Sequence, residues 1–128
     1  MNTRITIERL MAWKPCRHNY PRKRIVELFA GRTYVTPRGV HNAPIPLMDR
    51  IWVLGELLAE EDSTHFSVLH RNLWIQYPEN PCLYSNGNPN AQQWFYAELL
   101  RIFGIVEKLE AANVGTALAD TTKTTKGE

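Results

Sequence analysis

The sequence has few cysteines and no long apolar run. Its two cysteines, Cys16 and Cys82, are too few for a disulfide scaffold, and they show neither CxxC spacing nor the paired histidines of a zinc site. No stretch approaches the roughly 20 apolar residues of a membrane span, and the first ten residues are too polar for a signal peptide. We therefore expect a cytoplasmic protein without a membrane partner.

Motifs of catalysis are also missing. The patterns GxxxxGK[ST], GxGxxG, HExxH and GxSxG, which serve phosphate, dinucleotide, zinc and serine chemistry, do not occur. The closest pair of the four histidines, His65 and His70, is five residues apart, which directs the two rings to different helix faces. We expect no catalytic residue, no metal site and no cofactor. An enzyme would need a constellation assembled from distant residues.

Charge is divided unevenly along the chain. Residues 1–50 hold ten Lys or Arg against three Asp or Glu, a net charge of +7, whereas residues 51–128 hold five against ten, a net charge of −5. This separation of charge favours an acidic partner for the first half of the chain. The partner would be an acidic protein, a nucleic-acid-associated complex or nucleic acid itself. The alternative is a basic face that folds back on the acidic half.

Capping residues, prolines and apolar spacing predict an all-α fold. Thr6 and Thr36 precede helix starts as N-caps, Pro21 and Pro46 suit first helical positions, and Asp62 separates two helices. The expected architecture is a single-domain bundle of five or six helices over residues 1–114, with a disordered tail at 115–128. The expected helices are one that follows the Thr6 cap and runs to about Trp13, 21–30, 37–42, one from Pro46 to Asp62, 64–74 and 89–112.

The last helix is predicted to be long. Phe95, Leu99, Ile102, Val106 and Leu109 repeat at helical spacing, which is typical of the central element of a bundle. The same 95–109 heptad face could instead form the seam of a homodimer.

Aromatic residues near and within the 76–90 loop are candidates for binding another protein. The loop has three prolines and four asparagines, and a connection of this length is often functional. Trp74, Tyr77 and Tyr84 belong to residue types enriched at interface hot spots. Burial of these side chains in the core would be the other interpretation.

A second candidate site is a basic patch of Arg22, Lys23, Arg24, Arg32 and Arg38. The first three cations lie in the first turn of the predicted 21–30 helix, where the helix dipole disfavours them, so their placement brings no folding benefit. With Tyr20 and Tyr34 interleaved, the region has the ingredients for phosphate contacts and base stacking.

The order of elements over residues 5–75 resembles that of short all-helical accessory proteins of phages and bacteria that act as immunity or inhibitor factors. The segments that carry the resemblance are AWKPC at 12–16 and DRIWVLGELL at 49–58, with Ala12, Cys16, Trp52, Leu54 and Leu58 as the matching positions. These positions look structural, so no functional residue carries over.

The resemblance implies a non-enzymatic protein of a phage or mobile element. Such a protein would bind and block a toxin or a host-defence nuclease, such as a CRISPR effector. The alternative hypothesis is a nucleic-acid-binding protein that uses the basic N-terminal half.

Overall fold

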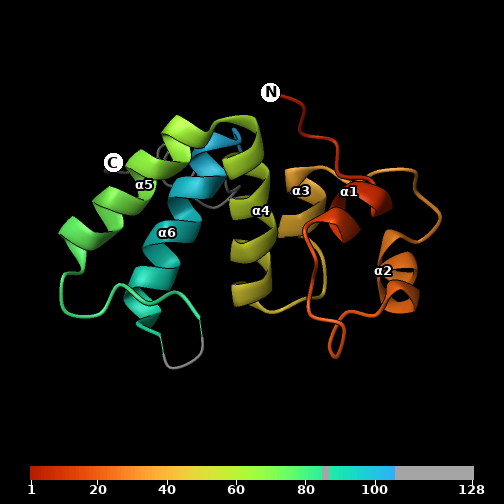
Figure 1. The fold of residues 1–128 in the computed structure, drawn as a ribbon, viewed down its shortest axis with the longest axis horizontal. Coiled ribbons are helices and arrows are strands. Elements are labelled where there is room, and N and C mark those ends of the chain that lie inside the picture. The colour runs from red at the N-terminus through yellow and green to blue at the C-terminus, as the bar shows by residue number, and fades with distance from the viewer. Residues whose placement is uncertain (85–86, 106–128) are drawn as a thin grey trace, which may run out of the picture.

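A computed structural model describes residues 1–84 and 87–105, and this part of the chain folds into six α-helices (Figure 1). Within these residues one isolated antiparallel bridge occurs and no strand. The prediction of an all-α fold with five or six helices is confirmed. None of the described helices is long and apolar enough to cross a membrane. The helices are α1 (Ile7–Ala12), α2 (Arg22–Phe29), α3 (Pro37–His41), α4 (Leu47–Glu61), α5 (Ser63–Gln76) and α6 (Pro89–Ile102).

Helices α4, α5 and α6 pack together and hold most of the hydrophobic core. In Figure 1 these three helices lie side by side, and α1, α2 and α3 lie beyond α4 on its other flank. Burial of apolar side chains on three helices at once is the main stabilising term of such a bundle. The fully buried side chains of this core include Ile51, Leu54, Leu57, Leu58, Leu73, Phe95 and Leu99.

Threonine caps start two of the N-terminal helices, as predicted. The hydroxyl oxygen of Thr6 accepts a hydrogen bond from the backbone N–H of Arg9 at 3.1 Å, and that of Thr36 accepts one from Gly39 at 3.3 Å. Pro21 and Pro46 differ from expectation by one position. Each has extended ψ and is the N-cap, so the helix begins at the following residue.

An unpredicted backbone pair ties two of these N-terminal segments together. The N–H of Ile5 donates to the carbonyl oxygen of Val35 at 2.8 Å, and the N–H of Val35 donates back to Ile5 at 2.9 Å. Ile5 is completely buried at this bridge. The segment before α1 is thereby fastened to the segment before α3.

The prediction of a long last helix is wrong, because α6 ends at Ile102. Gly104 adopts a left-handed conformation with φ of +74°. Its N–H donates to the carbonyl of Arg101 at 3.1 Å, and the N–H of Ile105 donates to that of Leu100 at 2.8 Å. These two bonds form a Schellman motif, in which a glycine closes the helix and Ile105 folds back onto the core.

The predicted heptad face is therefore divided. Phe95 and Leu99 are at most 1% exposed and pack inside the chain, and Ile102 is half-buried. Val106, Leu109 and the predicted tail at 115–128 lie outside the described residues. A homodimer seam on this face stays a prediction.

Helix α5 is longer than expected at both ends. Asp62 caps it by accepting the N–H of His65 at 3.1 Å, and the helix continues past Trp74 to Gln76. The 76–90 connection is thus shorter than predicted. Gln92 of α6 supports it by donating its side-chain amide to the carbonyl of Leu83 at 3.0 Å.

Candidate functional site

Two large apolar side chains are exposed side by side at the C-terminal end of α5. Trp74 is 62% exposed and Ile75 is 69% exposed. Leu69 and Leu73 occupy the opposite face and are buried, so the helical periodicity that fixes α5 on the core turns its last apolar residues outward. Val68 lies two turns before Ile75 on the same stripe and is 36% exposed.

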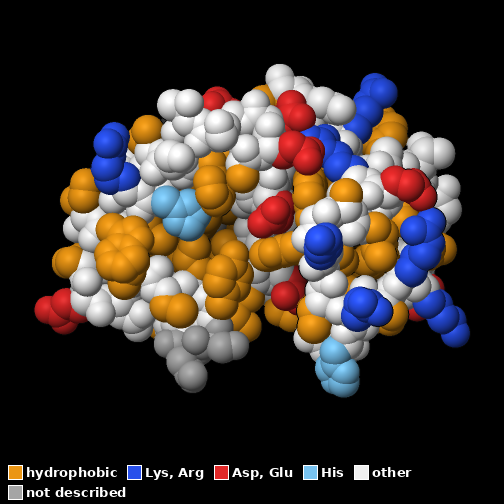
Figure 2. Space-filling model, viewed as in Figure 1, with side chains coloured by type: hydrophobic (Ala, Val, Ile, Leu, Met, Phe, Trp, Pro, Cys, Tyr) orange, Lys and Arg blue, Asp and Glu red, His pale blue; other side chains and the backbone are white. Residues whose placement is uncertain are grey.

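Tyr77, which directly follows α5, forms a half-buried aromatic pair with Trp94 of α6. The rings of Tyr77 and Trp94 meet edge to face, with centroids 6.1 Å apart, and both side chains also pack against the core. We call Trp74, Ile75, Tyr77 and Trp94 the aromatic patch. Figure 2 shows hydrophobic side chains gathered over α5 and α6, away from most of the Lys and Arg side chains. Patches of this kind mark interaction sites on monomeric proteins.

The His70 ring lies between two aromatic rings, in edge-on and tilted contacts, on the same helix face as Trp74. Its ring centroid lies 4.5 Å from that of Phe66 and 5.0 Å from that of Phe95. Burial lowers the pKa of His70 below its ordinary value. The imidazole is therefore neutral at pH 7, and it adds no charge beside the aromatic patch.

The structure separates Tyr84 from the other two aromatic candidates. Tyr84 is 44% exposed and lines a cavity between α2 and α4. Neither Trp74 nor Tyr77 lines this cavity. Burial raises the pKa of its phenol, with a further contribution from the carboxylate of Glu56. The three candidates therefore lie on two surfaces.

The five candidate cations are all exposed but also fall into two groups. Arg22, Lys23 and Arg24 lie in the first turn of α2, as predicted. Arg22 forms an exposed ion pair with Glu8 at 3.0 Å, which lowers the pKa of that carboxyl group, and the Arg24 guanidinium lies over the Tyr20 ring at 4.9 Å. The second group consists of Arg32 and Arg38, which line the same cavity as Tyr84.

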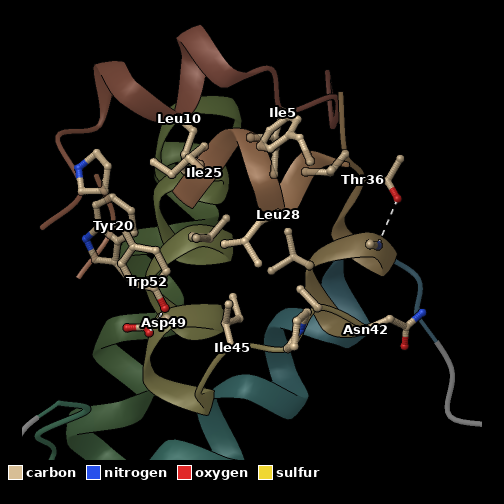
Figure 3. Close-up of a pocket in the computed structure, with 18 of the residues that line it drawn as sticks. Ile5, Leu10, Tyr20, Ile25, Leu28, Thr36, Asn42, Ile45, Asp49 and Trp52 are labelled. Carbon is tan, nitrogen blue, oxygen red and sulfur yellow. Dashed lines mark hydrogen bonds between the residues drawn. The ribbon is translucent and has the colours of Figure 1, made fainter. Parts of the chain in front are cut away.

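The cavity lies between α2 and α4 and has a volume of about 990 Å³. Figure 3 shows Leu10, Ile25, Leu28, Ile45 and Trp52 pointing into it from α1, α2, the α3–α4 connection and α4. Close-packed protein interiors contain few voids larger than a water molecule, so a hollow of this size is a candidate ligand site.

One hydrogen-bonded pair of side chains lies on the wall of the cavity. The hydroxyl of Tyr20 donates to the carboxylate of Asp49 at the start of α4 (Figure 3). Burial, followed by this hydrogen bond, raises the pKa of Tyr20 from 10.0 to about 12. The phenol therefore stays protonated at neutral pH and keeps Asp49 occupied as an acceptor.

The described residues do not assemble a metal centre. Across 1–84 and 87–105 no group of three His, Cys, Asp or Glu side chains is placed to hold an ion. Cys16 and Cys82 are both exposed, and Cys16 lines the cavity.

In the sequence, residue type alone indicated Trp74 and Tyr77 as interface candidates. The basic patch was indicated by the number of Lys and Arg residues in the first half of the chain. Ile75 was missed because its exposure depends on where α5 ends. The cavity was missed because it is formed by segments distant in sequence, and no local pattern reports a space between helices.

Comparison of the chain with protein-family models, with curated proteins and with solved structures gives no match.

Proposed function

We propose that the protein is a non-enzymatic protein-binding factor of the inhibitory or immunity type, which binds its target through the aromatic patch. The observation that carries the proposal is the pair of consecutive side chains, Trp74 and Ile75, that the fold leaves more than 60% exposed. The solvent exposure of such large apolar side chains is unfavourable, and it is relieved when a partner covers them. Tryptophan is among the residue types most enriched at binding hot spots.

The inhibitory character of the proposal rests on the resemblance of residues 5–75 to immunity-like accessory proteins. The target would be a toxin or a host-defence nuclease, such as a CRISPR effector, and the protein would come from a phage or mobile element. The basic N-terminal half would steer it toward an acidic target or a nucleic-acid-associated complex.

A capture experiment with a matched control tests the proposal. The tagged chain, its Trp74→Ala/Ile75→Ala double variant and the Val26→Ala variant are each incubated with native-host lysate that has been treated with nuclease. Val26 is 46% exposed on α2 and serves as an apolar control outside the patch. We expect a protein retained at high salt by the wild type and by Val26→Ala, and reduced about tenfold or more with the double variant. Equal retention by all three would refute the proposed surface.

A second candidate function is nucleic-acid binding by the basic half. It is favoured by the exposure of Arg22, Lys23 and Arg24 on one turn of α2, with Arg24 stacked on Tyr20. Labelled single-stranded DNA is the probe. This function predicts that log K falls linearly with log salt concentration, and that the Arg22→Gln/Lys23→Gln/Arg24→Gln variant has a shallower slope. A flat salt response of the wild type would exclude it.

A further inference from the structure

We propose that the cavity between α2 and α4 binds an amphipathic anion, a small molecule with an apolar body and a carboxylate head. The inference goes beyond the proposed function, because the aromatic patch is not part of this site. Its ligand class follows from the size of the cavity, the character of its interior and the charges around it.

The size and interior of the cavity suit an apolar molecule. A volume of about 990 Å³ is at the upper end of the range for small-molecule pockets. Leu10, Leu28 and Ile45 face it from three sides (Figure 3). Two of the polar side chains on its wall are engaged within the chain, since Tyr20 bonds Asp49 and Thr36 bonds the backbone of Gly39. An apolar body would therefore be favoured over water in this space.

Helix α2 lines the cavity without joining the main hydrophobic core. Ile25 and Phe29 of α2 are buried, at 1% and 4% exposure. Neither belongs to the main hydrophobic core, which joins side chains of α3, α4, α5 and α6 with Ile5. Helix α2 thus covers the cavity as a wall instead of packing directly into the core.

The charges lining the cavity favour an anion. Three cations, Lys14, Arg32 and Arg38, line it together with a single acid, Asp49. All three cations are exposed, and within the described chain none of them forms an ion pair. A carboxylate held at this rim would gain charge-assisted hydrogen bonds while its apolar body lies inside.

Decanoate, kept below its micelle concentration, is the probe, and binding to the full chain is measured by isothermal titration. Butyrate has the same head without the long body, and decyltrimethylammonium has a comparable body with the opposite charge. We expect saturable binding of decanoate and no binding of butyrate. The affinity for decyltrimethylammonium should be lower than that for decanoate by about tenfold or more. Absence of saturable decanoate binding at millimolar concentration would overturn the proposal, as would equal binding of the cation.

Variants locate the site. Leu28→Trp fills the cavity from α2, whereas Val26→Trp adds the same ring on the exposed face of that helix. We expect Leu28→Trp to weaken decanoate binding about tenfold or more and Val26→Trp to leave it unchanged. Circular dichroism checks folding, and Ile45→Trp fills the cavity from the opposite wall if Leu28→Trp does not fold. Unchanged binding by a folded cavity-filling variant would place the ligand elsewhere and refute the site.

The two proposals fail independently. The Trp74→Ala/Ile75→Ala variant should bind decanoate as the wild type does, and Leu28→Trp should retain the protein partner. Loss of decanoate binding in the patch variant would contradict the placement in this cavity.

Discussion

The guanidinium Nη2 of Arg9 lies 2.7 Å from the carboxylate Oε2 of Glu61, which joins α1 to the last residue of α4. The Arg9 side chain is only 14% exposed, and its Nε donates to Glu60 at 2.6 Å. Glu61 also accepts the backbone N–H of Asn2, and this bond, together with Arg9, holds the pKa of Glu61 below its ordinary value. The contact fastens the N-terminal segment to the helical core.

Removal of this link should destabilise the fold. We expect Arg9→Met to lower the melting temperature by several degrees, because it leaves two carboxylates without their hydrogen-bonded cation. Arg22→Met is the matched control, since the Arg22–Glu8 pair is 58% and 77% exposed and such pairs add little to stability. Thermal denaturation followed by circular dichroism compares the two. An equal effect of both variants would show that the Arg9 contact is not a structural link.

Gly55 within α4 and Gly104 just after α6 should respond to alanine in opposite directions. A Cβ at Gly55 would meet Phe66 at an ordinary contact distance of 3.7 Å, and alanine is the better helix former. Gly55→Ala should therefore raise the free energy of unfolding by about 0.5 to 1 kcal/mol. Gly104→Ala should lower it by about 1 kcal/mol or more, because alanine is strained at a φ of +74°. Chemical denaturation measures both, and a stabilising Gly104→Ala would contradict the observed end of α6.

The raised pKa of Tyr20 predicts a delayed titration. Among the five tyrosines, one should ionise near pH 12, and Tyr20→Phe should remove that step from the phenolate absorbance. Because the folded-state pKa lies above the unfolded value of 10.0, the stabilisation is fully present below pH 10 and is lost as the pH rises toward 12. Asp49→Asn should lower the Tyr20 pKa. An unchanged titration curve in both variants would show that the bond does not form in solution.

Local signals in the sequence predicted local structure well. Thr6, Thr36 and Asp62 act as caps where they were expected, because a cap depends on a few neighbouring residues. The apolar repeat that includes Phe95 and Leu99 identified α6 correctly but could not locate its end. There, one glycine in a Schellman motif outweighed the apolar residues that follow it.

Features that depend on tertiary packing could not be predicted. The residue type of Trp74 suggested an interface, but its exposure follows from how Leu69 and Leu73 seat α5. Tyr84 was grouped with Trp74 by sequence proximity, whereas the fold places it with Arg32 at the cavity.

Photo-crosslinking in the native host tests the central claim most directly. Trp74 is replaced by p-benzoylphenylalanine in one variant, and Val26, exposed on α2, is replaced in a control. The account predicts that position 74 forms a covalent adduct with one protein and that position 26 does not. Formation of the same adduct at both positions, or of none at position 74, would contradict binding through the aromatic patch.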